Sequence, residues 1–200
     1  QNGLTPWIAA MIPVLWILIG AVLSLCFSHM IQKTKSQSSE TFSWAMTVRH
    51  FGDLRELRKN EALWRCALGI AFFWCFGGFL QMLLIQIAAD RWGSLEGLGV
   101  GAAILWIPVV VGIVVGSLLA SWICNRRNEL GLIVIGGALM CLSTGFLAIF
   151  QMGAISLLLL VLTGFGGALY LVPLNVFLQD QAPENQRGMV LSASNLCINL

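Results

Sequence analysis

The sequence predicts an all-α polytopic membrane protein, and three observations lead to this fold class. Hydrophobic residues make up 58% of the chain and charged residues only 10%, whereas a soluble domain carries roughly 25% charged residues. Five apolar segments each hold about 20 residues or more, enough for a helix to cross a hydrocarbon core of roughly 30 Å. No Asp, Glu, Lys or Arg lies deep in any of them. The segments are 6–27, 66–89, 98–123, 130–150 and 155–178, and residues 188–200 have the pattern of the first half of a sixth.

The first segment is predicted to be a true membrane span within residues 1–30. It is too long for a signal peptide, and no basic residue precedes it. The chain starts at Gln1 without an initiator Met and ends at Leu200 inside an apolar segment. We therefore expect further helices on both sides of the sequence.

The only long connection, residues 31–65, follows the first span. Its first part is polar, and from Phe42 onward Trp44, Val48, Phe51 and Leu54 fall on one side of a helix. Such a helix is expected to lie along the membrane surface with its apolar side in the headgroup region. It is either a structural linker between two helical bundles or a regulatory element, and the pattern favours the linker.

The basic residues predict the orientation of the spans. Ten of the eleven Lys and Arg residues lie in alternate connections, and only Arg91 lies in another. The positive-inside rule therefore places the loops 31–65, 124–130 and 179–188 in the cytoplasm. The net charge of +2 then reflects topology and gives no reason to expect nucleic-acid binding.

Small residues and prolines predict how the later spans pack and bend. Gly112, Gly116 and Ala120 recur every four residues in the third span, which lets a neighbouring helix approach closely. Pro108 and Pro173 each remove a backbone donor and are expected to kink their helices. A sliding or gating helix and static packing both remain open.

The cysteines and histidines predict neither a metal site nor a catalytic site. The six cysteines form no CxxC pair, and most lie in apolar spans, so we interpret them as small core residues. His29 and His50 are expected at the membrane interface. No catalytic residue, metal or other cofactor is expected.

The polar residues within the spans are the clearest candidates for a site, because each must find a partner or face water. Gln81 and Gln86 lie five residues apart in the second span, and Asn175 and Gln179 share one side of the fifth. Hydrogen bonding between helices and contact with a substrate are equally consistent with their positions.

The chain resembles the second half of a Major Facilitator Superfamily transporter, and within it the bacterial lysophospholipid transporters, including those fused to a phospholipid acyltransferase. The likeness covers nearly the whole chain. It rests on Phe73 and Trp74, on GIVVG at 112–116, on VPLNVFLQDQAPENQRG at 172–188, and on 192–195. The resemblance implies that residues 1–30 are helix six of twelve, that 31–65 are the cytoplasmic linker, and that 66–200 are helices seven to early eleven.

Two features depart from the family pattern. The loop after the third span, SWICNRRNELG, keeps the paired basic residues Arg126 and Arg127 but lacks the acidic residue of the usual signature. Gln81 is neutral at a position where a charged residue could have contacted a lipid phosphate. Both features bear on the substrate rather than on the superfamily.

The resemblance implies movement of a lysophospholipid, such as lysophosphatidylethanolamine, from the outer to the inner leaflet of the bacterial cytoplasmic membrane by alternating access. An acyltransferase domain or partner would then restore the second chain. Membrane lipids are the other expected partners. The expected substrate contacts are Gln81, Gln86, Asn175, Gln179, Phe76 and Phe79; the expected structural or gating residues are Gly112, Gly116, Pro108, Pro173, Arg126, Arg127 and Arg187.

Two alternatives remain. One is a general exporter of drugs or metabolites from the same superfamily. The other is an enzyme of lipid metabolism, but the acyltransferase motif needs Asp five positions after His, and here His29 is followed by Thr34 and His50 by Arg55. The residues present therefore predict a transporter and no enzyme.

Overall fold

The computed structural model describes residues 6–30, 52–93, 95–124, 130–150, 153–183 and 187–199. The chain divides into two units, Gln1–Ser43 and Trp44–Leu200. The first unit contains α1 (Pro6–Met30), a 25-residue apolar helix at the place of the first predicted span. All the described side chains of α1 are exposed within this chain.

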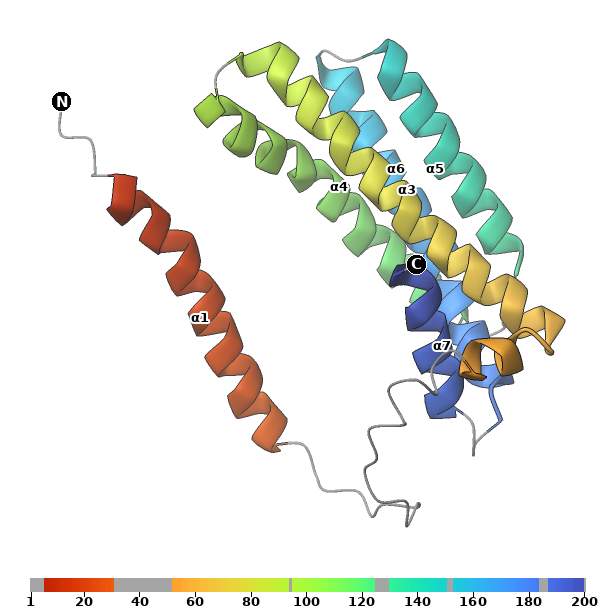
Figure 1. Ribbon diagram of the computed structural model, residues 1–200. Coiled ribbons are helices and arrows are strands. Elements are labelled where there is room, and N and C mark those ends of the chain that lie inside the picture. Colours follow the sequence, from red (N-terminus) through yellow and green to blue (C-terminus); the bar gives the residue numbers. More distant parts are fainter. Residues whose placement is uncertain are drawn as a thin grey trace. The chain divides into compact units, whose positions relative to one another are not determined.

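The second unit is a bundle of helices without any strand among the described residues. Figure 1 shows α3 to α6 running lengthwise beside one another, with α7 against one end of α3. Four of these helices are long and apolar enough to cross a membrane, which confirms the predicted fold class. The helices are α3 (Glu61–Trp92), α4 (Leu95–Cys124), α5 (Gly131–Ile149), α6 (Ala154–Gln181) and α7 (Arg187–Asn199).

Helix α3 begins at Glu61, ahead of the predicted start at Cys66, because Asn60 caps it. The Asn60 side chain accepts hydrogen bonds from the backbone N–H groups of Ala62 at 3.2 Å and Leu63 at 3.3 Å, which satisfies two of the free donors of the first turn. At the other end Gly93 takes a left-handed φ of 60° and its N–H binds the Ala89 carbonyl at 2.9 Å. A polar cap outside the apolar run therefore lengthens the helix beyond the hydropathy signal.

The end of the predicted linker is part of the bundle. Residues 52–57 are helical, and Leu57 is only 1% exposed. The part of the predicted surface helix that carries Trp44, Val48 and Phe51 lies outside the described residues. Leu57, which lies within the predicted linker 31–65, is therefore packed into the core of the second unit. Its side chain belongs to the linker-end cluster, which comprises Leu57, Leu63, Cys66, Ala67, Ile70, Leu174, Leu178, Ala182, Val190 and Ala193.

Helix α6 is the most buried of the four candidate spans and packs against both α4 and α5 through glycines. A Cβ atom at Gly112 of α4 would overlap the carbonyl oxygen of Val161, and one at Gly164 of α6 would overlap the carbonyl oxygen of Val109. On the other side of α6, a Cβ at Gly136 of α5 would lie 2.6 Å from the Tyr170 nitrogen. The predicted close approach of a neighbouring helix at Gly112 is confirmed, and α6 is that neighbour.

The chain reverses direction at alternate ends of the bundle. At one end, Leu57 before α3 and Ala182 after α6 share the linker-end cluster. At the other end, Arg91 of α3 donates a hydrogen bond to Ser156 of α6 at 2.9 Å, and Ser156 donates to the Gly153 carbonyl at 2.8 Å. Basic residues that lie in alternate connections can be on one side of the membrane only if the chain reverses in this way. The side of the membrane on which each end lies stays a prediction.

Candidate functional site

Aromatic side chains connect α3 to α6 and continue onto the exposed side of α3. The rings of Phe73 and Tyr170 stack with centroids 6.4 Å apart, and the Tyr170 hydroxyl donates to the Gly69 carbonyl at 3.1 Å. The rings of Phe76 and Phe79 lie 6.5 Å apart. Phe76 is half-buried and Phe79 is 60% exposed. Of the two predicted aromatic contacts, Phe79 is therefore open to a ligand from outside the described bundle, and Phe76 only partly so.

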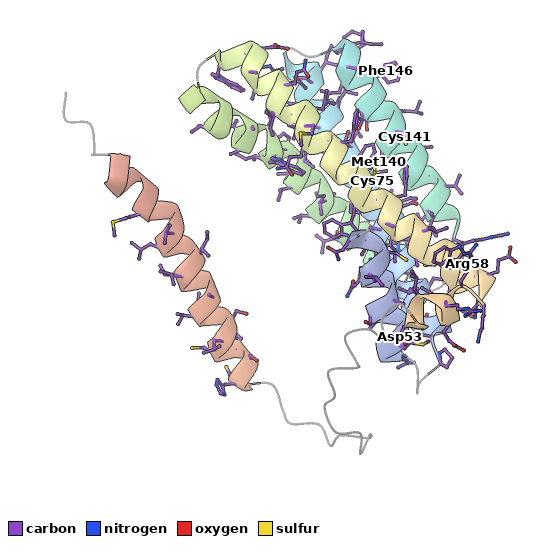
Figure 2. All side chains as sticks on the ribbon, in the orientation of Figure 1. Asp53, Arg58, Cys75, Met140, Cys141 and Phe146 are labelled. Carbon is purple, nitrogen blue, oxygen red and sulfur yellow. The ribbon has the colours of Figure 1, made fainter. Side chains whose placement is uncertain are left out.

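A small apolar cavity lies between α3, α4, α5 and α6, and we call it the central cavity. Its volume is about 50 Å³, well below the roughly 150 Å³ that accommodates benzene. It cannot hold a lipid in this conformation. Met140, which Figure 2 labels near the middle of the bundle, lines it. The lining residues are Phe73, Phe76, Gly77, Leu80, Trp106, Val109, Ile113, Met140, Thr163, Gly164 and Gly167.

The structure separates the four predicted polar contacts into two sets. Gln81 and Gln86 are exposed on α3, about 140° apart around the helix axis because they are five residues apart. Asn175 is half-buried and donates to the Leu171 carbonyl of its own helix at 3.1 Å. Gln179 is exposed near the end of α6.

The two sets lie at different depths. Cys66 of α3 donates a hydrogen bond to the carbonyl of Leu174, the neighbour of Asn175, at 3.1 Å. Gln81 follows Cys66 by fifteen residues, which is about 22 Å along the helix axis. The six predicted substrate contacts therefore do not form one compact site.

Sequence analysis missed a group of buried hydroxyl side chains between α5 and α6. The hydroxyl oxygens of Ser143 and Thr163 lie 2.8 Å apart, and those of Thr144 and Thr163 lie 3.3 Å apart. Thr163 also donates to the Leu159 carbonyl at 2.9 Å. These bonds hold the two helices together, since polar groups within a membrane must find partners. In the sequence, Ser143, Thr144 and Thr163 are visible as short polar interruptions in two apolar spans. The sequence does not show that these two spans pack against each other.

Two of the hollows in the structure lie near the C-terminal end of α6. One, of about 550 Å³, has walls from α4 and α6 and includes Ser121, Trp122 and Val176. The other, of about 270 Å³, lies at the turn from α6 to α7 and includes Gln179 and Arg187. The first falls within the usual size range of ligand sites, and neither Ser121 nor Trp122 was singled out from the sequence.

The predicted structural residues occupy different kinds of place. Pro108 and Pro173 lie inside α4 and α6, which continue through them. Gly116 also faces the backbone of α6, where a Cβ would lie 2.7 Å from the Phe165 oxygen. Arg187 is the exposed first residue of α7. Arg126 and Arg127 lie outside the described residues.

None of the six cysteines forms a disulfide, and no three His, Cys, Asp or Glu side chains in the described part of the chain gather as metal ligands would. The expectation of core cysteines holds for buried Cys66 but is wrong for Cys75 and Cys141, which are exposed on α3 and α5. A thiol in a membrane span can face lipid as readily as protein, because both surroundings are apolar. Hydropathy therefore does not distinguish a cysteine that faces lipid from one that is buried between helices.

Comparisons with known proteins place this bundle in a family. Comparison with curated proteins and with solved structures gave no match. The family description that matches, Major Facilitator Superfamily, covers residues 3–200, and it agrees with the four apolar membrane-length helices. This superfamily consists of membrane transporters rather than enzymes. The chain therefore belongs to the Major Facilitator Superfamily of membrane transporters and is a multi-pass membrane protein.

Proposed function

We propose that this transporter moves lysophospholipid from the outer to the inner leaflet of a bacterial cytoplasmic membrane by alternating access. The observation that supports this most is the exposed aromatic side of α3. Phe72, Phe76 and Phe79 are spaced by four and three residues, and Gln86 follows after seven more, so all four share one side of the helix. Phe72 and Phe79 are at least half exposed, and Gln86 is exposed.

This side of α3 matches an amphipathic molecule. Three aromatic rings offer a long apolar surface, and the amide of Gln86 offers hydrogen bonds to a polar head near the end of the helix. The interiors of the spans carry no charged side chain, so a neutral or zwitterionic head avoids an unpaired charge better than a strongly charged solute does. An acyltransferase domain or partner would then complete the lipid in the inner leaflet.

The separated polar sets fit a moving substrate. Gln86 and Gln81 lie toward one end of the bundle, and Asn175 and Gln179 toward the other. A lipid head that crosses the membrane would contact the first pair early and the second pair late. Alternating access requires such successive contacts on the two sides of the membrane.

A leaflet assay tests the proposal. Full-length protein is reconstituted in vesicles, and fluorescent lysophosphatidylethanolamine is followed between leaflets by its accessibility to an added quencher. We expect the wild-type protein to accelerate the movement, and Gln86→Leu, which keeps the size but removes the amide, to slow it about tenfold, the effect of roughly 1.4 kcal/mol. Ile85→Leu, at an exposed position of α3 about 100° around the helix axis from Gln86, is the matched control.

The competing function gives a different result. A general exporter would transport a soluble drug in the same vesicles while leaving the lysophospholipid in its original leaflet. That outcome would overturn the lipid proposal and leave the superfamily assignment intact.

A further inference from the structure

The hollow at the turn from α6 to α7 is lined by side chains of opposite charge, and we call it the turn hollow. Its lining combines the carboxylate of Asp180, the guanidinium of Arg187 and the amide of Gln179 with the apolar side chains of Ala182 and Leu191. The described lining of the hollow between α4 and α6 holds no charged side chain. The turn hollow therefore offers one partner to an anion and another to a cation.

The walls of the turn hollow are held in place by the linker-end cluster. Ala182, which lines the hollow, and Val190 of α7 are both buried in that cluster together with residues of α3. Arg187 and Leu191 are four residues apart on α7, so they lie on the same side of this helix. The backbone positions around the hollow are thus fixed before any ligand arrives, which reduces the cost of binding.

The turn hollow lies where the proposed path of the lipid head ends. Gln179 follows Asn175 by one turn of α6, about 6 Å along the helix axis, and it lines the hollow. The distribution of basic residues predicts that this end of the bundle is cytoplasmic. A head group that has passed Asn175 on its way to the inner leaflet would therefore meet the hollow next.

The size of the turn hollow suits a head group. Its volume is about 270 Å³, above the roughly 150 Å³ that accommodates benzene and below the roughly 300–1,000 Å³ of most sites for a whole ligand. A phosphorylated head group has room here, whereas the acyl chain of the same lipid must lie elsewhere.

The charges of the turn hollow suit a zwitterion. The planar guanidinium of Arg187 matches the oxygens of a phosphate group. An ionised carboxylate has about four lone-pair sites, so Asp180 can accept hydrogen bonds from an ammonium group in addition to contacts within the protein. A phosphoglycerol head brings no cation for Asp180, and its negative charge is repelled by that carboxylate.

We propose that the turn hollow binds the phosphoethanolamine head of a lysophospholipid, with Arg187 on the phosphate and Asp180 on the ammonium group. The identity of the lipid rests on the proposed function. The hollow adds a preference to it, because an ethanolamine head satisfies both charged side chains and a glycerol head satisfies only one.

Binding of the isolated head group tests this site without transport. Full-length protein in detergent is titrated in a calorimeter with glycerophosphoethanolamine, glycerophosphoglycerol and inorganic phosphate. We expect glycerophosphoethanolamine to bind most tightly. Arg187→Gln is expected to weaken the binding of both glycerophosphodiesters about tenfold, whereas Asp180→Asn weakens only that of glycerophosphoethanolamine and removes the preference. Arg55→Gln and Asp90→Asn are the matched controls, because both positions are exposed and neither lines the hollow.

Three results would overturn the proposal: no binding of glycerophosphoethanolamine, equally tight binding of glycerophosphoglycerol, or unchanged binding in the Arg187 and Asp180 variants. Equally tight binding of inorganic phosphate would show a site for free anions and would also contradict the head-group assignment. The leaflet assay fails independently of this one. Binding without leaflet movement would contradict the proposed function and keep the site, whereas movement without binding would contradict the site and keep the function.

Discussion

At the scale of single residues, glycine has different roles at Gly112 and Gly77. Gly112 lies where two helix backbones touch, so the absence of a side chain is a steric requirement. Gly77 faces empty space, so the absence of a side chain serves no contact in this conformation. The amino-acid type is the same, and only the surroundings separate a glycine at a backbone contact from one beside open space.

The substitution Gly112→Ala tests the steric role. Its methyl group would overlap the Val161 carbonyl oxygen, and overpacking of this kind costs about 1–3 kcal/mol. We expect a lower midpoint of thermal unfolding in detergent. Gly145→Ala is the matched control, because Gly145 of α5 is exposed and its Cβ would meet nothing within 4 Å. Equal midpoints for the two variants would contradict the close contact of α4 and α6.

At the scale of elements, the last residues of the linker act as a part of the bundle. Leu57 packs with residues of α3, α6 and α7, and Asn60 caps α3 three residues later. The position of this segment is therefore tied to the turn between α6 and α7. A displacement of Leu57 would disturb its packing against α3, α6 and α7.

The substitution Leu57→Ala measures this attachment. Removing a fully buried leucine side chain costs about 2–5 kcal/mol, so we expect a marked fall in the midpoint of thermal unfolding. Lys59→Ala is the control, since the Lys59 side chain is 68% exposed and its ion pair with Glu56 contributes about 1 kcal/mol or less. If Leu57→Ala unfolds at the same temperature as Lys59→Ala, the segment is not part of the folded core.

At the scale of the whole molecule, the alternation of the turns between the two ends of the bundle agrees with the distribution of basic residues in the sequence. The loops with ten of the eleven basic residues are expected on one side of the membrane. In the structure, residues 52–60 and the turn after α6 share one end, whereas the turn before α6 lies at the other.

Labelling of single cysteines determines which end is cytoplasmic. In a cysteine-free variant, Lys59→Cys is expected to react with a membrane-impermeant maleimide only in inside-out vesicles. Ala154→Cys, at the exposed start of α6, is expected to react only in right-side-out vesicles. The reverse result would show that the positive-inside assignment is wrong, and reaction of both in the same vesicles would contradict the alternation of the ends.

The sequence by itself determined the fold class, the approximate spans and the need for close packing at Gly112 and Gly116. These features depend on composition and on local periodicity, since a span of about 20 apolar residues has few other solutions in a membrane. Because these signals are local, they could not predict how the candidate site is arranged. Gln81 and Asn175 could be recognised as polar groups in apolar spans, but their depths relative to each other could not, because that depends on how α3 and α6 pair.

Only the tertiary structure decided which helix meets Gly112, that Leu57 enters the core, that Thr163 binds the hydroxyls of α5, and that a cavity lies beside Gly77. Each of these facts joins residues far apart in the chain. Hydrophobic residues face lipid and protein alike in a membrane, so hydropathy cannot show which neighbours they have. The contacts are fixed by how closely the helix backbones and side chains fit, and that fit exists only in the assembled bundle.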